Sequence, residues 1–168
     1  MTLDQLDALD LAAFRETLGG IFEHSPWVAE EVWPLRPFAG IDALHAAMCK
    51  AVVDAGEDAQ LALLRAHPQL AGKAALRGEL TPSSTSEQQG AGLDQCTAEE
   101  YARLHELNAR YEQRFGFPFI LAVRGHTRAS ILANMAARVD NPRDEEFAEA
   151  LHQVERIARF RLEALLQA

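Results

Sequence analysis

The sequence predicts an all-α fold, a compact multi-helix bundle in one domain that spans residues 1–168. Segments rich in Ala, Leu, Glu and Arg dominate the chain, and these residues have high helix propensity. Runs of β-branched residues at strand spacing are nearly absent. Apolar residues instead recur at spacings of three and four, which places them on one face of a helix. A single domain of this length buries roughly 70% of the surface that its unfolded chain exposes.

Four helices are expected in the first part of the chain, at about residues 3–18, 27–33, 41–55 and 57–67. The connections between them contain the glycine and proline residues that are typical of turns. Before the second helix, Ser25 and Pro26 have the pattern of an N-cap and a first helical residue. The fourth helix is expected to end near His67, because Pro68 moves the residue before it away from the helical region.

A histidine at a helix end has two interpretations. The free carbonyls and the negative end of the helix dipole favour a protonated ring there, so His67 could serve chemistry. From its position alone, a simple C-terminal cap is the favoured interpretation. The residues around it have to decide between these interpretations.

A segment rich in Gly, Ser, Thr and Pro follows, between His67 and Thr97. A compact domain seldom keeps a long irregular segment that has no use. Within this segment Ser84 and Glu87 have the spacing of a capping box, which predicts the start of a helix. A helix start also favours anions, because its first backbone N–H groups point outward. The two interpretations of this motif are compatible.

Two strong helices are expected in the last part of the chain. One opens with the capping-box pair Thr97 and Glu100 and stops at Gly116. The other opens with Asn141 and Pro142 and carries three acidic residues in its first turn. Its core stripe is predicted to consist of Phe147, Leu151, Val154, Ala158, Leu162 and Leu165.

The segment RFGFPFILAVRG (residues 114–125) is mostly aromatic and aliphatic, so most of its side chains are expected in the core. A buried helix is one interpretation of it. Pro118 has no N–H and perturbs the turn around it, which leaves backbone groups of the residues after it for a ligand. Arg124 is either an anion partner or a solvated cation at a helix end.

Charge and composition exclude several classes of function. The net charge of −9, from 16 basic and 25 acidic side chains, disfavours nucleic-acid binding. No apolar run reaches the roughly 20 residues that span a bilayer, and the acidic start is unlike a signal peptide, so a cytoplasmic protein without a membrane partner is expected. Cys49 and Cys96 are expected to be reduced thiols. Nucleotide-binding, serine-hydrolase and metal motifs are absent from the sequence, so neither a metal nor a cofactor is predicted.

Four motifs stand in one order along the chain: FEHSPW (residues 22–27), AHPQLAGK (66–73), LTPSSTSEQQGAGLD (80–94) and RFGFPFILAVRG (114–125). Together they resemble the 2-oxo-4-hydroxy-4-carboxy-5-ureidoimidazoline (OHCU) decarboxylases of purine breakdown, over nearly the whole chain. The resemblance implies an all-helical single domain without a cofactor. It also implies a small-molecule substrate, the last oxidised intermediate from urate, which is converted to (S)-allantoin.

The resemblance assigns site residues position by position. His67 matches the catalytic histidine of the family, and Glu87 matches its partner carboxylate. The ligand-contacting positions of the family fall on three segments of this chain: Pro68; Ser84, Thr85, Ser86 and Gln88; and Phe119, Ile120, Leu121, Ala122 and Val123.

Two departures from the family pattern bear on these expectations. Many members continue after AVRG with a Lys-rich turn, whereas HTRAS follows here, which leaves the roles of His126 and Arg128 open. The chain ends in LLQA, without the peroxisomal signal of eukaryotic members, which favours a bacterial cytosolic enzyme. Some members are fused to a transthyretin-like hydrolase, for which this chain has no room.

Several questions about partners and rivals stay open at the level of sequence. A homodimer and functional coupling to 5-hydroxyisourate hydrolase are partner arrangements to be tested. One rival function is a non-catalytic helical binding module for a purine-derived ureido metabolite. A second is a cofactor-free enzyme of the same fold that acts on a different ureido acid.

Overall fold

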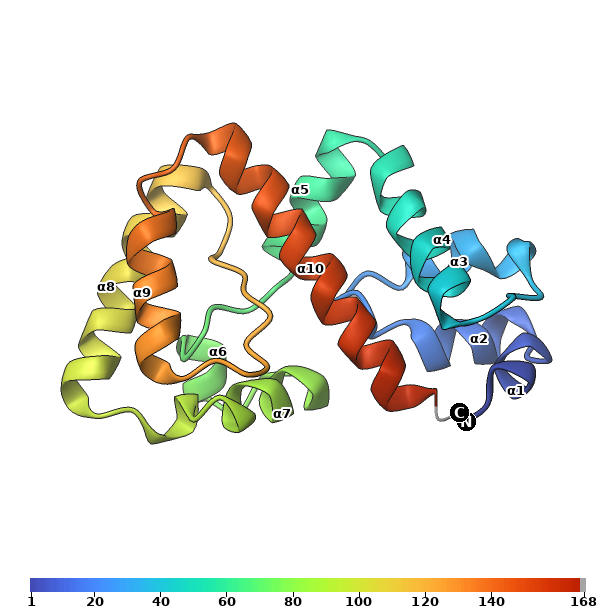
Figure 1. Cartoon of the computed structure of the whole chain (residues 1–168), viewed down its shortest axis with the longest axis horizontal. Helices are drawn as coiled ribbons and strands as arrows, with labels where there is room; N and C mark the ends of the chain where they lie inside the picture. Colours follow the sequence, from blue (N-terminus) through green and yellow to red (C-terminus); the bar gives the residue numbers. More distant parts are fainter. Residues whose placement is uncertain (167–168) are drawn as a thin grey trace. The chain divides into compact units, whose positions relative to one another are not determined.

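In the computed structural model, which describes residues 1–166, every element of regular structure over these residues is helical (Figure 1). The prediction of an all-α fold is confirmed. The chain forms two compact units. The terminal unit consists of Met1–Ala66 and the chain from Val154 onward, and the central unit consists of His67–Gln153. Within residues 1–166, no helix combines the length and the apolar character that crossing a membrane requires.

Up to residue 166, the terminal unit contains five α-helices, one 3-10 helix and the later part of the longest of the described helices. Its core includes Phe14, Leu44 and Met48, and α3 packs against both α2 and α4. The elements are α1 (Leu3–Asp7), α2 (Leu11–Leu18), α3 (Trp27–Val32), η1 (Trp33–Leu35), α4 (Ile41–Asp54), α5 (Glu57–Arg65) and, from Val154, α10 (Arg143–Leu165).

The helix expected over residues 3–18 is two helices. The first ends with Ala8 as its C-cap. The second starts after Asp10, whose carboxylate accepts a hydrogen bond of 2.9 Å from the N–H of Ala13. Asp is a favoured N-cap because its short side chain satisfies a free N–H group of the first turn. The pattern of apolar residues continues through this region without interruption, so it did not indicate the boundary between α1 and α2 that Asp10 sets.

The chain between α2 and α3 is held by a buried ion pair. Glu23 lies 2.8 Å from Arg161 of α10, and Arg161 also donates to the carbonyl of Gly20 at 2.9 Å. The predicted N-cap at Ser25 is wrong, because its hydroxyl donates to the carbonyl of Glu23 and the N-cap position is Pro26, which has no capping side chain. Hence Ser25 serves the turn before α3 and not the helix end.

The central unit contains more helix than the sequence predicted. Apart from a helix start at Ser84, the segment after His67 was expected to be irregular, yet it includes α6 (Lys73–Leu76) and η2 (Leu93–Gln95) in addition to α7 (Pro82–Gly90). Next come α8 (Ala98–Phe115) and α9 (Arg128–Arg138), which pack side by side (Figure 1), followed by the first part of α10. The helix α9 was not predicted.

The start of α7 differs from the predicted capping box. Thr81 is its N-cap and accepts the N–H of Ser84 at 3.3 Å, with Pro82 in the first turn. Ser84 therefore occupies the first turn, and Glu87 lies almost one turn further along the helix. The Ser84–Glu87 capping box was wrong because Thr-Pro three residues earlier is a stronger start signal.

The two helices predicted with most support, α8 and α10, are confirmed. Thr97 and Glu100 form both hydrogen bonds of the capping box, and Gly116 ends α8 in a left-handed conformation with φ of 79°. In α10 the predicted stripe is fully buried at Val154, Ala158 and Leu162, whereas Phe147, Leu151 and Leu165 are half-buried. Only the central part of the stripe is thus enclosed.

The segment between α8 and α9 is not helical. Residues 117–123 have no regular secondary structure, and all of them are buried. The buried-helix interpretation of this segment is therefore wrong. Gly116 stops the preceding helix, and Pro118 disfavours helical continuation because it lacks an N–H and restricts the residue before it.

A buried ion pair joins α9, α10 and this irregular segment. Arg138 donates to both carboxylate oxygens of Glu146 at 2.9–3.1 Å and to the carbonyl of Ile120 at 2.8 Å. The hydroxyl of Tyr111 donates to the same carboxylate. Burial, followed by this hydrogen bond to Glu146, raises the pKa of Tyr111 far above its usual value. The charged groups of this cluster thus find hydrogen-bond partners on α8, α9 and α10 and in residues 117–123.

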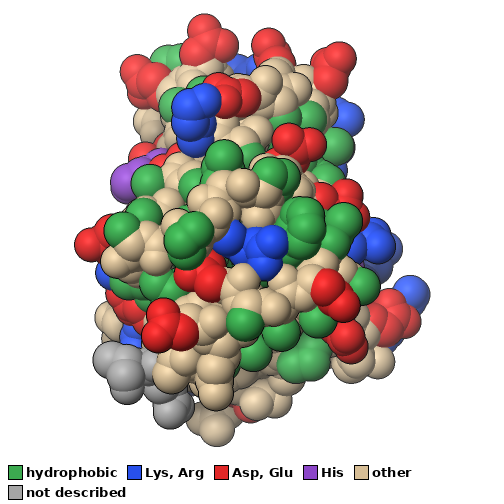
Figure 2. Space-filling view, turned by 90° about the vertical axis from the view of Figure 1, so that its right-hand side faces the viewer, with side chains coloured by type: hydrophobic (Ala, Val, Ile, Leu, Met, Phe, Trp, Pro, Cys, Tyr) green, Lys and Arg blue, Asp and Glu red, His purple; other side chains and the backbone are tan. Residues whose placement is uncertain are grey.

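Charged side chains on the surface follow the composition. Figure 2 shows one face of the molecule, on which acidic side chains are distributed among hydrophobic and basic ones. On that face the basic side chains do not form a continuous stripe of the kind that a nucleic acid would require. The absence of a nucleic-acid partner stays a prediction.

Loss of Glu146 should destabilise the fold strongly. In Glu146→Ala the guanidinium of Arg138 stays buried without its counter-charge, and we expect the free energy of unfolding to fall by about 3–5 kcal/mol. Urea denaturation followed by far-UV circular dichroism measures this change.

Glu106→Ala on α8 is the matched control, because Glu106 forms an exposed ion pair of 3.2 Å with Arg103. Its effect should be about 0.5 kcal/mol or less. Equal losses in the two variants would contradict a special role for the buried pair.

Candidate active site

All residues that the sequence assigned to the site lie in the central unit. His67 is the first residue of this unit. It follows Arg65, the last residue of α5, and the C-cap Ala66, so it stands just beyond the helix end, close to where the sequence placed it. Its side chain is buried, with 8% exposed, whereas Pro68 is half-buried. A buried imidazole beyond a helix end is more than a solvated cap.

The turn after His67 is held by α7. The side-chain oxygen of Gln88 accepts the N–H of Ala71 at 2.9 Å, and its nitrogen donates to the carbonyl of Gln69 at 3.3 Å. Ala71 has a φ of 50°, a conformation that costs about 1–2 kcal/mol for a residue with a Cβ. A Cβ on Gly72 would lie 2.7 Å from the Cβ of Gln69, so glycine is required there. The chain that carries His67 is thereby tied to the helix that carries Glu87.

The five predicted residues of α7 differ in exposure. Ser84 and Gln88 are buried and lie one helical turn apart. Thr85 and Glu87 are half-buried, and Ser86 is exposed. Both polar atoms of the Gln88 side chain already bond to the Gln69–Ala71 turn, which leaves one amide hydrogen for a ligand. The assignment of these residues to the substrate stays a prediction.

In the third predicted segment, residues 119–123, only some of the backbone groups form hydrogen bonds within the protein. The carbonyl of Ile120 is taken by Arg138, and the N–H of Ala122 donates to Gln153 at 3.0 Å. Within residues 1–166, no hydrogen bond reaches the N–H groups of Ile120, Leu121 or Val123. Buried N–H groups without a partner are rare in native proteins, so these three donors are candidates for contact with a bound ligand.

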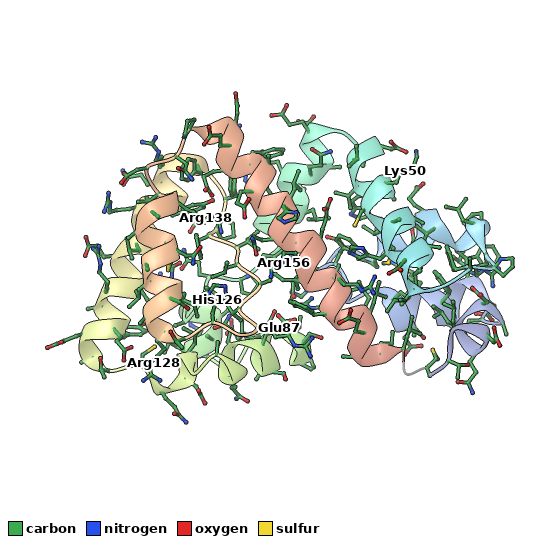
Figure 3. All side chains as sticks on the ribbon, in the orientation of Figure 1. Lys50, Glu87, His126, Arg128, Arg138 and Arg156 are labelled. Atoms are coloured by element: carbon green, nitrogen blue, oxygen red, sulfur yellow. The ribbon has the colours of Figure 1, made fainter. Side chains whose placement is uncertain are left out.

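Two side chains that the sequence left open have local roles in the structure. The ring of His126 bonds through Nδ1 to the hydroxyl of Ser130 at 2.9 Å. Arg128 binds the carboxylate of Glu100 at 2.9 Å and the carbonyl of Gly92 at 3.2 Å, which ties η2 to the starts of α8 and α9. The backbone N–H of Thr97 and then Arg128 lower the pKa of Glu100. Figure 3 shows Glu87 on α7 and His126 in the loop before α9.

No metal centre is formed by the residues that the structure describes. No group of three His, Cys, Asp or Glu side chains in residues 1–166 lies where it could hold a metal ion. Burial raises the pKa of the Cys49 thiol to about 12, so Cys49 is a poor nucleophile. Burial also raises the pKa of Cys96.

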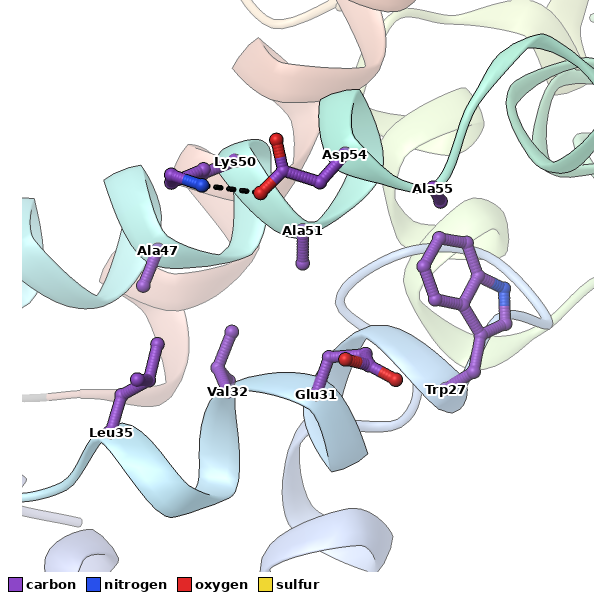
Figure 4. A pocket seen from close by; sticks show the side chains of 9 residues that line it. All are labelled: Trp27, Glu31, Val32, Leu35, Ala47, Lys50, Ala51, Asp54 and Ala55. Atoms are coloured by element: carbon purple, nitrogen blue, oxygen red, sulfur yellow. Dashed lines mark hydrogen bonds and ion pairs between the residues drawn. The ribbon is translucent and has the colours of Figure 1, made fainter.

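The terminal unit has a cavity of its own, of about 310 Å³, between α3 and α4 (Figure 4). Trp27 and Val32 contribute to its apolar wall, and an ion pair between Lys50 and Asp54 lies at its edge. None of the predicted site residues lines it. The FEHSPW motif thus contributes Trp27 to this cavity and not to the central unit.

Comparison with known proteins assigns the chain to a family. The model of the OHCU decarboxylase family matches residues 7–163. The chain belongs to the OHCU decarboxylase family. A relative from Haloferax volcanii, named 2-oxo-4-hydroxy-4-carboxy-5-ureidoimidazoline decarboxylase, is 44% identical over 162 residues, which are 96% of this chain and 94% of the relative. The uric acid degradation bifunctional protein PucL of Bacillus subtilis is also 44% identical, over 96% of this chain but 32% of its own length.

Solved structures support the same fold. A crystal structure of (S)-allantoin synthase has a TM-score of 0.80 and 34% identity, and the match covers 99% of this chain and 54% of that one. A crystal structure of OHCU decarboxylase in the presence of (S)-allantoin has a TM-score of 0.69 and covers 91% of this chain and 96% of that one. At 23% identity the second structure supports the fold alone.

The supporting side chains of this OHCU decarboxylase family member were missed by sequence reasoning. Arg138, Gln153 and Asn108 are polar residues on the buried faces of α9, α10 and α8. Their positions carried a signal, because each lies three or four residues from buried apolar residues of its own helix. A polar residue on an apolar stripe indicates a buried partner.

Replacing Gln88 should loosen the turn after His67. In Gln88→Leu the N–H of Ala71 and the carbonyl of Gln69 lose their partner inside the protein, so we expect stability to fall by about 1–3 kcal/mol. Amide hydrogen exchange at Ala71 should accelerate, and NMR measures it. The control is Gln89→Leu at the exposed neighbouring position. An unchanged exchange rate at Ala71 in Gln88→Leu would refute the role of Gln88 in holding this turn.

Proposed function

We propose that this chain decarboxylates 2-oxo-4-hydroxy-4-carboxy-5-ureidoimidazoline to (S)-allantoin, with His67 as the proton donor and Glu87 as its partner carboxylate. The observation that carries the proposal is membership of the OHCU decarboxylase family over residues 7–163. The burial of His67 and its link through Gln88 to the helix of Glu87 support the two roles.

The proposed substrate can release CO2 without a cofactor. Its name places a carboxylate and a hydroxyl on one ring carbon, beside a ring carbon that is doubly bonded to nitrogen. When the bond to CO2 breaks, its electron pair can form a double bond between the two ring carbons, the pair of the C=N bond moves to the nitrogen, and that nitrogen takes up a proton. This internal electron sink does the work that a cofactor such as pyridoxal phosphate performs elsewhere.

The stereochemistry of the product depends on one proton. The neighbouring ring carbon must receive a proton on one face while the hydroxyl loses its own proton and becomes the carbonyl. A histidine suits this step because its ordinary pKa near 6.5 allows it to donate and recover a proton at neutral pH. Positioned proton transfer is typically worth about 10²- to 10⁴-fold in rate. In this scheme Glu87 either orients the ring of His67 or accepts the hydroxyl proton.

The other assigned residues fit an anionic ligand that is rich in urea-type groups. Ser84 offers a hydroxyl, Gln88 one amide hydrogen, and the segment 119–123 offers backbone N–H groups. The apolar side chains of the same segment exclude water, and this strengthens each electrostatic contact. Pro68, Thr85 and Ser86 complete the set that we assign to the substrate.

Four further expectations belong to this proposal. We treat residues 1–168 as one functional domain, because the family match extends across both compact units. A cytoplasmic location is proposed on the basis of the sequence, and a homodimer is proposed as an arrangement to be tested. Coupling to 5-hydroxyisourate hydrolase gains support from the bifunctional relative PucL, whose name links two activities of uric acid degradation in one chain.

His67→Asn should abolish the enzymatic reaction. The substrate is generated in place from urate with the two preceding enzymes, and circular dichroism follows the allantoin that forms. Wild-type protein should yield (S)-allantoin rapidly. His67→Asn should leave only the slow, racemic product of spontaneous decay, because the proton donor is gone while the fold is retained.

The matched control for His67→Asn is His105→Asn, which changes an exposed histidine on α8. Undiminished (S)-allantoin output by folded His67→Asn would refute the assignment of His67. Slow, racemic product from the wild type would refute the decarboxylase and favour the rival binding module. Turnover of a different ureido acid alone would favour the second rival, an enzyme of the same fold with another substrate.

Glu87→Gln tests the partner carboxylate. Removal of its negative charge makes a protonated imidazole less favourable, so we expect lower turnover and a high-pH limb of activity that moves to lower pH. The measurement is the pH profile of (S)-allantoin formation by circular dichroism. An unaltered profile would assign Glu87 to the structure of α7 only.

A further inference from the structure

The turn between His67 and α6 is held from a second direction, by α8. Asn108 donates through its side-chain nitrogen to the carbonyl of Leu70 at 2.9 Å. One turn later on the same helix, the carboxylate of Glu112 accepts a hydrogen bond from the side chain of Gln69. Together with Gln88 from α7, these contacts bind three consecutive residues of the turn.

Asn108 is energetically unfavourable at its position, because a polar side chain is buried there. It is 3% exposed and lies on the apolar face of α8, between Leu104 and Tyr111. Its side-chain oxygen is buried and has no hydrogen-bond partner among the residues that the structure describes. A buried polar atom without a partner costs free energy, so packing alone would favour leucine here. The hydrogen bond from its side-chain nitrogen to the Leu70 carbonyl explains why asparagine stands here.

The group that it holds lies where the backbone is strained. Leu70 precedes Ala71, which keeps its left-handed conformation only as long as the surrounding contacts enforce it. Gln88 fixes the N–H of Ala71, and Asn108 fixes the carbonyl of Leu70, so opposite sides of one peptide group are held by two helices. Release of either side lets the turn relax, and His67 lies only three residues before Leu70.

We propose that Asn108 is a positioning residue, which sets the place of the His67 imidazole relative to α7 by holding the Leu70 carbonyl. Its side-chain hydrogen bond goes to the Leu70 carbonyl, so it acts through the backbone of the turn. This inference rests on the proposed function for its catalytic consequence. Its structural consequence, a displaced His67 ring, does not.

The test is Asn108→Leu, which keeps the size and burial of the side chain and removes its donor. We expect kcat for (S)-allantoin formation to fall about 10- to 100-fold, because small displacements of a catalytic group have effects of this size, with KM within about twofold. NMR of histidine-labelled protein should show a displaced His67 ring resonance, with the other five histidines unchanged.

Asn134→Leu is the matched control, because the side chain of Asn134 on α9 donates to the carbonyl of Ser130 in its own helix. It should alter neither kcat nor the His67 resonance. If Asn108→Leu does not fold, Asn108→Ser serves instead, since its hydroxyl is too short to reach the Leu70 carbonyl.

A folded Asn108 variant with lowered stability but unchanged kcat and an unchanged His67 resonance would overturn the proposal. Absence of (S)-allantoin formation by the wild type would sink the proposed function alone. In that case the NMR comparison decides by itself: a displaced His67 resonance supports the positioning role, and an unmoved one refutes it.

Discussion

The central unit depends on the buried ion pair between Arg138 and Glu146. Residues 117–123 have no helix or strand to satisfy their backbone, and Arg138 supplies one of their few fixed points by donating to the Ile120 carbonyl. A buried pair of charges is seldom more stable than apolar residues of the same volume, because both charges lose their hydration. Its benefit here is geometric. The guanidinium is planar with several donors, so it joins a carboxylate and a carbonyl in one fixed arrangement, which a leucine could not do.

The helix α8 connects this cluster to the turn that carries His67. Asn108 holds the turn, and Tyr111, three residues later, donates to Glu146 and packs edge-on against Phe119 at 5.3 Å between ring centroids. Residues three apart on a helix lie on the same face, so one stripe of α8 contacts both the turn after His67 and the segment that contains Phe119. The two segments are therefore fixed relative to one rigid element, although more than 40 residues separate them in the sequence.

How far the sequence predicted this arrangement depended on whether the signals were local. The capping box of α8 and the acidic first turn of α10 are local, and both helices were predicted correctly. The start of α7 was misjudged because Ser84 and Glu87 imitate a capping box, whereas Thr81 and Pro82 make the cap. Gly116 and Pro118 are local signals against a helix in residues 117–123, but the buried course of this irregular segment depends on partners from α9 and α10 that are distant in sequence. The assignment of site residues came from resemblance. The burial of residues 119–123 was predicted from their apolar character, whereas the burial of His67, Ser84 and Gln88 came only from the structure.

The distribution of donors fits the charge of the whole molecule. A protein with a net charge of −9 does not attract an anionic substrate by its overall field, so binding has to come from groups at short range. On the proposed assignment, backbone N–H groups of Ile120, Leu121 and Val123 supply it. Such donors carry no net charge and cannot titrate, so on this assignment they would hold the carboxylate without fixing the protonation state of His67. A nearby lysine or arginine would disfavour the protonated imidazole that the reaction needs. Neutral donors thus leave the histidine able to deliver its proton.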